Sequence, residues 1–202
     1  MKKLAMMALL ALCLSVGPAH SADNYKTAVF AGGCFWSMES AFDDVKGVVK
    51  TEAGFSGGTV KNPSYEQVSQ GDTGHREAVQ VTYDPAVITY DALLDVYWHS
   101  IDPTDERGQF CDKGSEYRSA VFYGSDNEKK AAESSKAAVA KDLNKDVATD
   151  IIPAAPFYPA EDYHQQYHKK NPTAYGMYRR GCGRDNSLRG IWGDKARTMP
   201  GF

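Results

Sequence analysis

The stretch that organises this sequence is Gly32-Gly33-Cys34-Phe35-Trp36-Ser37-Met38. An apolar, strand-like run over residues 27–31 precedes it, and apolar residues at helical spacing follow it. Two glycines at the junction permit a tight turn from strand to helix. Cys34 is therefore expected in the first turn of a helix, where unpaired N–H groups favour a thiolate. Phe35 and Trp36 could line an apolar pocket beside the sulfur, although a buried structural cysteine is an equally open interpretation.

Length and charge limit the number of domains and the kinds of ligand that this chain can have. A chain of 202 residues is long enough for one domain with a buried core. Its net charge of −3 and the lack of a long basic run argue against nucleic-acid binding. Twelve tyrosines and three tryptophans are compatible either with an aromatic-lined site or with an aromatic core.

The first residues have the pattern of a secretory signal peptide. Lys2 and Lys3 precede an apolar run over residues 4–16, and Ala19 and Ser21 then suit the −3 and −1 positions of a cleavage site. The run is short for a transmembrane helix. We therefore expect residues 1–22 to be removed, residues 23–202 to form a single catalytic domain, and the protein to be exported to the periplasm.

Cysteine usage favours catalysis over a disulfide framework. Cleavage would remove Cys13 and leave Cys34, Cys111 and Cys182, an odd number that leaves at least one thiol unpaired. Cys111 lies in a long polar loop over residues 102–114, a feature that is often functional. Cys182 lies between two glycines and beside arginines, which lower a thiol pKa.

The order of elements predicts an α+β fold. Strands and helices alternate, but short strand-to-strand connections also occur, which fits a two-layer sandwich with a ferredoxin-like mixed sheet. After Asn171-Pro172 we expect an extended, aromatic and basic C-terminal tail. Strands are expected over residues 27–31, 48–55, 78–83, 117–123 and 147–152, and helices after Cys34 and over residues 89–100, 126–143 and 160–170.

Several motifs, taken together and in order, resemble the peptide methionine sulfoxide reductase A family. They are Gly33-Cys34-Phe35-Trp36, Tyr65-Glu66-Gln67-Val68, Thr73-Gly74-His75-Arg76-Glu77-Ala78-Val79, Tyr83-Asp84-Pro85, Asp102-Pro103-Thr104, Asp112-Lys113-Gly114-Ser115-Glu116-Tyr117-Arg118-Ser119 and Ala160-Glu161-Asp162-Tyr163-His164-Gln165-Gln166-Tyr167. The match runs from about Lys26 to Trp192. The resemblance implies reduction of the S epimer of methionine sulfoxide, free or in oxidised proteins and peptides, without a metal or an organic cofactor.

The resemblance also implies roles for individual residues. Cys34 matches the nucleophile whose thiolate attacks the sulfoxide sulfur. Glu77 matches the acid that protonates the departing oxygen, and burial would keep its carboxyl protonated. By its sequence context alone, Glu77 would be a solvated carboxylate at a strand end. Tyr65 and Tyr117 match two hydroxyl donors to the same oxygen, which resemble an oxyanion hole.

Other matches concern the pocket and its support. Phe35 and Trp36 match the pocket for the S-methyl group, and Asp112 matches a supporting acid. Residues at three further family positions near the site receive no chemical step: His164, Tyr167 and Tyr175.

A second thiol should condense with the Cys34 sulfenic acid that forms. One form of the family carries this thiol at the position of Gly176, whereas Cys182 resembles the later position of another form. Cys182 is thus the expected resolving cysteine, and Cys111 is the alternative. The resemblance implies a Cys34–Cys182 disulfide that a thioredoxin-like donor reduces.

Two other functions remain possible from the residues. A thiol peroxidase or a thiol–disulfide oxidoreductase would also use a sulfenic acid or a redox disulfide, but the chain has no C-x-x-C motif. A secreted binding module with one structural disulfide is the second. Turnover of peroxide in preference to sulfoxide would favour the first, and an accessible Cys34 thiol of low pKa would argue against the second.

Overall fold

The structure is a computed structural model, and it describes residues 24–199. The expected signal peptide lies outside the described residues. Six strands form one sheet in the order β7-β6-β1-β3-β2-β8. Neighbouring strands are antiparallel except for β6 and β7, which are parallel. The strands are β1 (Lys26–Ala31), β2 (Val48–Ser56), β3 (Arg76–Tyr83), β6 (Ala120–Tyr123), β7 (Asp150–Pro153) and β8 (Tyr158–Pro159).

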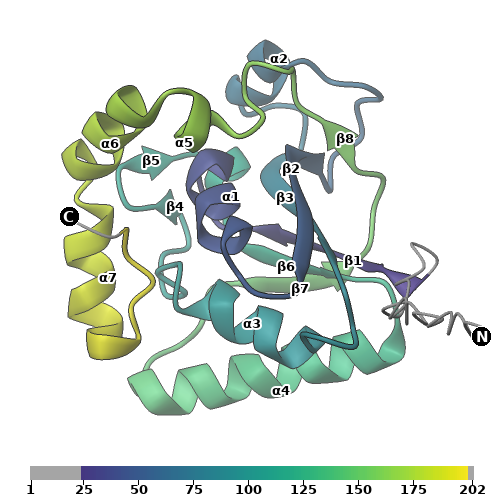
Figure 1. The fold of residues 1–202 in the computed structure, drawn as a ribbon, viewed down its shortest axis with the longest axis vertical. Helices are drawn as coiled ribbons and strands as arrows, with labels where there is room; N and C mark the ends of the chain where they lie inside the picture. The colour runs from purple at the N-terminus through teal and green to yellow at the C-terminus, as the bar shows by residue number, and fades with distance from the viewer. Residues whose placement is uncertain (1–23, 200–202) are drawn as a thin grey trace, which may run out of the picture.

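The central four strands have the ferredoxin-like arrangement. Strand β1 leads through α1 to β2, β2 leads back to β3, and β3 leads through α3 to β6. Three helices cover one face of the sheet (Figure 1): α1 (Phe35–Asp43), α3 (Tyr90–Trp98) and α4 (Asp126–Leu143). The expected two-layer α+β sandwich is therefore confirmed.

The main core lies between this helical layer and the sheet. Phe30 of β1 stacks on Phe42 of α1 and on Tyr97 of α3, with ring centroids 5.2 Å apart in both pairs. Val79 and Val81 of β3 are fully buried in the same core. Burial of these side chains fixes the sheet register, because a slip of one residue would turn every inward side chain outward.

The C-terminal residues differ from the expected extended tail. They form two helices, α6 (Pro172–Gly181) and α7 (Arg184–Trp192), followed by the 3₁₀ turn η3 (Gly193–Lys195). Pro172 begins α6. Proline is favoured at this position because the backbone N–H that it lacks would have no partner in the first turn of a helix. The helix expected over residues 160–170 is reduced to a turn and the short α5 (Tyr167–Lys170).

The remaining short elements lie in connections that frame the site. They are α2 (Tyr65–Ser69), β4 (Gly108–Gln109), β5 (Asp112–Lys113) and the 3₁₀ turn η2 (Ser115–Tyr117). Strands β4 and β5 pair as a hairpin beside α6 and α7 (Figure 1). The loop expected over residues 102–114 thus contains ordered structure.

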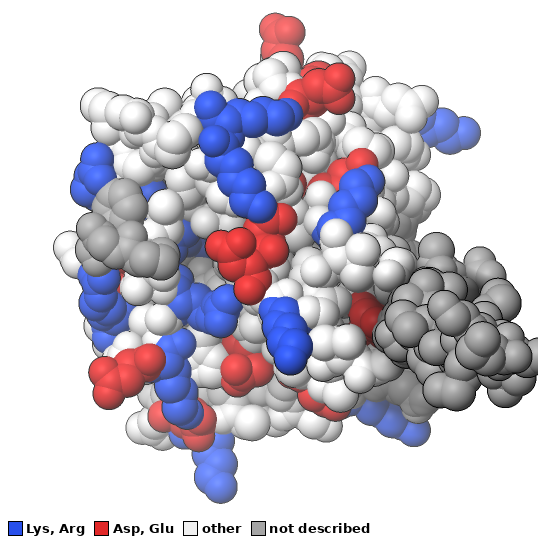
Figure 2. Space-filling model, in the orientation of Figure 1, with Lys and Arg blue, Asp and Glu red and all other residues white. Residues whose placement is uncertain are grey.

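Two surface properties of the described residues bear on function. None of their helices combines the length and the apolar character that crossing a bilayer requires. On the face shown in Figure 2, acidic and basic side chains are interspersed. This face therefore lacks the continuous basic stripe that is typical of nucleic-acid-binding proteins.

Candidate active site

Cys34 lies at the strand-to-helix junction, as the sequence predicts. It is the N-cap residue of α1, and 7% of its surface is exposed. Gly33 has a φ of +78°, and a Cβ there would come within 2.5 Å of the Gln109 side chain. Glycine is therefore required both by the backbone conformation and by the close approach of the loop that contains Gln109.

A cavity of about 70 Å³ opens next to the Cys34 sulfur. Its walls come from α1, α2, β3, β5, η2 and α6, which are far apart in the sequence. The lining residues are Cys34, Phe35, Trp36, Tyr65, Glu77, Asp112, Tyr117 and Tyr178. Every predicted site residue except Cys182 is on this wall, and Tyr178 is an addition that the sequence analysis missed.

Glu77 is a buried carboxyl aimed at the start of α1. It lies on β3 opposite Phe55 of β2, is 3% exposed, and accepts a hydrogen bond of 2.9 Å from the backbone N–H of Phe35. Burial raises the pKa of Glu77 to about 8, helped by the negative charges of Asp112 and Glu116 and opposed by the Phe35 N–H. Glu77 is therefore protonated at neutral pH and can donate a proton into the cavity.

Tyr65 and Tyr117 place two phenol groups on the same cavity. Tyr65 is the first residue of α2, where the Glu161 carboxylate accepts its backbone N–H at 3.0 Å, and Tyr117 ends η2. Burial, followed by the charge of Glu77, raises the pKa of Tyr65 to about 12 and raises that of Tyr117 further. Both hydroxyls thus keep their protons and act as hydrogen-bond donors.

The pKa of the Cys34 thiol is raised, which corrects the expectation of a thiolate. Burial is the main cause, and the negative charge of an ionised Glu77 is the second. The polar Tyr178 hydroxyl beside the sulfur lowers the pKa but does not reverse the shift. The partial charge of a helix N-terminus is smaller than the cost of placing a full charge in a closed apolar site. Cys34 therefore rests as a thiol and ionises only as it reacts.

Tyr178 connects the cavity to Asp112. Its hydroxyl donates a hydrogen bond to the Asp112 carboxylate, and its ring meets the Trp36 ring edge-on, with centroids 5.8 Å apart. Helical spacing in α6 carries the only sequence signal for this residue, since Tyr178 lies three residues after Tyr175 and four before Cys182. That signal is lost when the segment is taken as extended.

Phe35 and Trp36 form an aromatic wall, as expected. Phe35 is 1% exposed and packs on Phe55, with centroids 5.8 Å apart. Trp36 stacks on Tyr167 at 3.8 Å and donates its indole N–H to His164 Nδ1 at 3.1 Å. Burial lowers the pKa of His164, so the ring is neutral and accepts this bond. His164 and Tyr167 therefore hold Trp36 in place.

Cys182 is bonded to Cys111, not to Cys34. The Cys111–Cys182 disulfide joins the tip of the β4–β5 hairpin to the end of α6, with Cα atoms 5.0 Å apart, while Cys34 is a free, buried thiol. The expected Cys34–Cys182 bond is thus not the one formed in this state. The reason is that the loop and α6 both fold against the cavity, which brings together two cysteines 71 residues apart.

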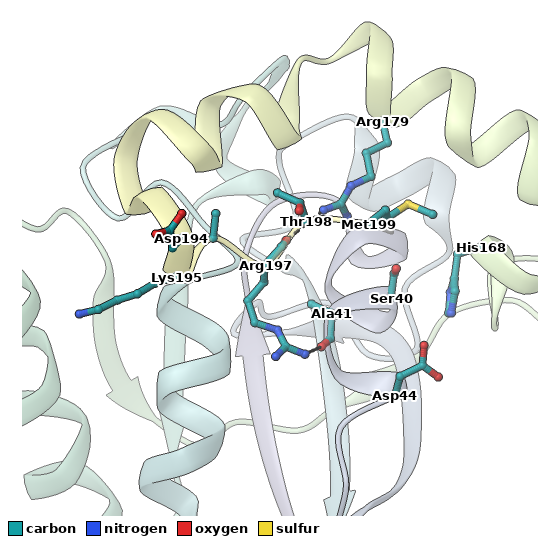
Figure 3. A pocket seen from close by; sticks show the side chains of 11 residues that line it. Ser40, Ala41, Asp44, His168, Arg179, Asp194, Lys195, Arg197, Thr198 and Met199 are labelled. Carbon is teal, nitrogen blue, oxygen red and sulfur yellow. Dashed lines mark hydrogen bonds between the residues drawn. The ribbon is translucent and has the colours of Figure 1, made fainter. Parts of the chain in front are cut away.

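A larger cavity of about 490 Å³ lies elsewhere, between α1 and the residues that follow α7. Figure 3 shows Arg179 and Arg197 entering it, with the Arg197 guanidinium donating to the Ala41 carbonyl at 3.1 Å. Its wall includes His168 and Asp44 but no cysteine. The reactive groups converge instead on the small cavity at Cys34.

The small cavity suits a substrate in which one atom accepts a proton while a neighbouring atom is attacked by the cysteine sulfur. The neighbouring disulfide offers a route by which the resulting oxidising equivalents can leave. The fold and the site therefore define a thiol-dependent oxidoreductase.

Comparison with known proteins specifies the family. Residues 26–196 match the family model of peptide methionine sulfoxide reductase. The peptide methionine sulfoxide reductase MsrA of Bacillus licheniformis is 52% identical over 176 residues, which cover 86% of this chain and 97% of the relative. The chain belongs to the peptide methionine sulfoxide reductase family.

Solved structures agree with this assignment. Reduced Mxr1 from Saccharomyces cerevisiae superposes with a TM-score of 0.71 and 34% identity, covering 77% of this chain and 90% of Mxr1. Mxr1 in complex with Trx2 superposes with a TM-score of 0.52 and 26% identity, covering 76% and 92% of the two chains.

Proposed function

We propose that this chain reduces the S epimer of methionine sulfoxide, free or in oxidised proteins and peptides, with Cys34 as nucleophile. The observation that carries the proposal is the convergence of Cys34, a protonated Glu77 and two phenol hydroxyls on one cavity of about 70 Å³. A cavity this small takes a methyl-sulfoxide group and leaves the rest of the substrate outside.

Protons and electrons balance within the site. Cys34 sulfur attacks the sulfoxide sulfur while Glu77 protonates the oxygen and Tyr65 and Tyr117 hold it by hydrogen bonds. The oxygen leaves the methionine sulfur and ends on Cys34 as a sulfenic acid. Methionine gains two electrons, Cys34 loses two, and the proton lost by the thiol replaces the one that Glu77 gave. Phe35 and Trp36 receive the S-methyl group.

A resolving thiol and an external donor complete the cycle. Cys182, when reduced, condenses with the sulfenic acid, forming a Cys34–Cys182 disulfide and releasing water. The complex of the relative Mxr1 with Trx2 supports a thioredoxin-like donor for this chain. Such a donor reduces a disulfide through a mixed disulfide.

The decisive experiment uses a peptide containing one methionine sulfoxide, separated into its S and R epimers. With dithiothreitol as reductant, the S peptide should be converted to methionine and the R peptide should be left unchanged. Conversion of hydrogen peroxide in preference to the S peptide would instead show a thiol peroxidase.

Removal of the phenol hydroxyls should slow reduction. Tyr65→Phe and Tyr117→Phe should each reduce the single-turnover rate by less than Glu77→Gln does. The double variant should lose more than either, without strict additivity, because both hydroxyls bond to one oxygen. Rapid-quench measurement of methionine release tests this expectation. A double variant that reacts at the wild-type rate would exclude a role for the two hydroxyls.

Loss of the resolving thiol should separate the first turnover from recycling. Cys182→Ser leaves Cys34, Glu77 and the tyrosines in place, so each enzyme should release about one equivalent of methionine and then hold a Cys34 sulfenic acid. Thioredoxin should not recycle this variant, whereas dithiothreitol should. Trapping with dimedone, followed by mass spectrometry, would measure the sulfenic acid on Cys34. Normal cycling of Cys182→Ser with thioredoxin would assign the resolving role to Cys111.

Export is part of the proposal. The charge and apolar pattern of residues 1–22 supports secretion and cleavage, which leaves residues 23–202 as one catalytic domain in the periplasm. Mass spectrometry of the N-terminus of protein recovered from a periplasmic fraction should show a start near Asp23. Recovery of the intact chain from the cytosol would contradict this localisation.

A further inference from the structure

We infer that Glu39, which does not itself line the cavity, limits the size of the S-alkyl group that the cavity accepts, because it fixes the position of Trp36. The inference rests on the proposed function and deepens it, since it concerns the pocket that receives the S-methyl group. The link between Glu39 and Trp36 is residues 164–167, which we call the clamp segment.

Trp36 is the wall of the pocket whose position depends on the clamp segment. Phe35, the other apolar wall, is 1% exposed and packs on Phe55 of the sheet, so the core holds it. Trp36 is only partly buried. The stacked Tyr167 ring sets the plane of the Trp36 ring, and His164 holds its indole N–H. The size of the pocket therefore depends on where the clamp segment lies.

The two middle residues of the clamp segment anchor it to the rest of the fold. The Gln165 amide accepts the Ala53 N–H at 2.9 Å and donates to the carbonyls of Ala53 and Ala160, each at 2.8 Å. The bonds to Ala53 attach the segment to β2. Gln166 attaches it to α1, the helix that bears Trp36.

Glu39 is the group on α1 that binds Gln166. Its side chain is fully buried. One carboxyl oxygen accepts the Gln166 backbone N–H at 2.9 Å, and the other accepts the Gln166 side-chain amide at 3.0 Å. The Thr51 hydroxyl of β2 donates to this second oxygen at 3.3 Å. A carboxylate offers an acceptor on each of its two oxygens, which is what these donors require.

The backbone at Gln166 explains why the clamp segment needs such an anchor. Gln166 has a φ of +54°, a left-handed conformation that is unfavourable for a residue with a Cβ atom. Such a residue keeps this conformation only where the surrounding structure holds it. The bonds of Glu39 to both the backbone and the side chain of Gln166 do so. The turn ends at Tyr167, the first residue of α5, whose ring then lies on Trp36.

Loss of this anchor should widen the pocket without removing the chemistry. Cys34 is placed by the strand-to-helix junction and Glu77 by its bond to the Phe35 N–H, and neither depends on the clamp segment. One extra methylene in an apolar pocket changes kcat/KM by about 10–200-fold. The wild-type enzyme should therefore prefer an S-methyl to an S-ethyl sulfoxide, and release of Trp36 should reduce that preference.

The test compares the S-sulfoxides of N-acetylmethionine and N-acetylethionine, each reduced by the full-length enzyme with dithiothreitol. Glu39→Gln replaces one acceptor oxygen by an NH₂ group, so one of the two Gln166 donors loses its partner. We expect the ratio of kcat/KM for the methyl over the ethyl substrate to fall by about tenfold, the lower end of the range for one methylene.

Gln166→Gly provides a second variant in case Glu39→Gln does not fold. Gln166 is only partly buried, and glycine accepts the left-handed conformation but lacks the side-chain amide that Glu39 binds. The methyl-to-ethyl ratio should fall in this variant too. A wild-type ratio in Gln166→Gly, or in folded Glu39→Gln, would overturn the inference.

Asp43→Asn is the matched control for a general loss of stability. Asp43 lies one turn after Glu39 on α1, where one oxygen contacts His168 and Lys169 and the other accepts the Gln166 amide at 3.2 Å. Asparagine keeps the second oxygen and loses the ion pair, so Tm should fall while the methyl-to-ethyl ratio stays at the wild-type value. An equal fall of the ratio in this control would overturn the inference. A wild-type enzyme that reduced neither sulfoxide would contradict the proposed function instead.

Discussion

Cys34→Ser is expected to abolish methionine sulfoxide reduction with every reductant. A serine oxygen that accepted the sulfoxide oxygen would form a weak O–O bond, whereas sulfur forms a stable sulfenic acid. The residue is 7% exposed and its neighbours stay in place, so the fold should survive a change of one atom. The measurement is methionine release in single turnover and in steady state with dithiothreitol, beside circular dichroism of the variant.

The other two cysteines provide the controls for this result. Cys111→Ser and Cys182→Ser each keep the Cys34 thiol and should still release methionine in the first turnover. Measurable turnover by Cys34→Ser would show that another group attacks the sulfoxide. A variant of Cys111 or Cys182 that lost the first turnover would place those sulfurs in the chemical step.

The junction that bears Cys34 could be predicted because its signals are local. An apolar strand, two glycines and a helical apolar pattern are contiguous in the sequence, and the structure joins β1 to α1 there. The positive φ of Gly33 and its contact with Gln109 explain the glycine in retrospect. The contact itself involves a loop some 75 residues later, and no local pattern predicts it.

The acid could be named only through the family resemblance. Glu77 has the sequence context of a solvated strand-end carboxylate, yet it is 3% exposed and accepts the Phe35 N–H. Its burial depends on the pairing of β3 with β1 and β2, which places it under the start of α1. Pairing between distant strands is not encoded in spacing along one segment.

The C-terminal region was predicted least well. In sequence, Asn171-Pro172 is typical of the end of a helix, whereas Pro172 is the first residue of α6. An extended segment there would keep Tyr178 out of the site and Cys182 away from Cys111. The expected Cys34 thiolate is wrong for a similar reason. The helix N-terminus that favours a thiolate is a local feature of the sequence, whereas the burial of the thiol beside Tyr65, Tyr117 and Tyr178 depends on distant segments.

Glu77→Gln should slow methionine formation in single turnover by about 10²–10⁴-fold, the usual contribution of a general acid. Glutamine preserves the shape of the side chain and its carbonyl oxygen can still accept the Phe35 N–H. Substrate affinity and the fold should therefore change little. Rapid-quench kinetics at saturating sulfoxide measure the chemical step apart from recycling.

The pH profile provides the sharper test of Glu77. With a pKa of about 8, Glu77 carries its proton below that pH and loses it above. Cys34 is also protonated in this range, because burial raises its pKa. The reacting form holds both protons, so the wild-type single-turnover rate should be constant below about pH 8 and should fall above it. The Glu77→Gln rate should show no such fall.

Glu116→Gln is the matched control for this profile. Glu116 is buried, and its negative charge contributes to the raised pKa of Glu77. Without that charge Glu77 ionises more easily, so the fall in rate should begin at a lower pH while the rate at low pH is preserved. A wild-type rate that rises with pH through 8 would contradict the assignment, because it would mean that loss of a proton, rather than its donation by Glu77, limits the attack on the sulfoxide.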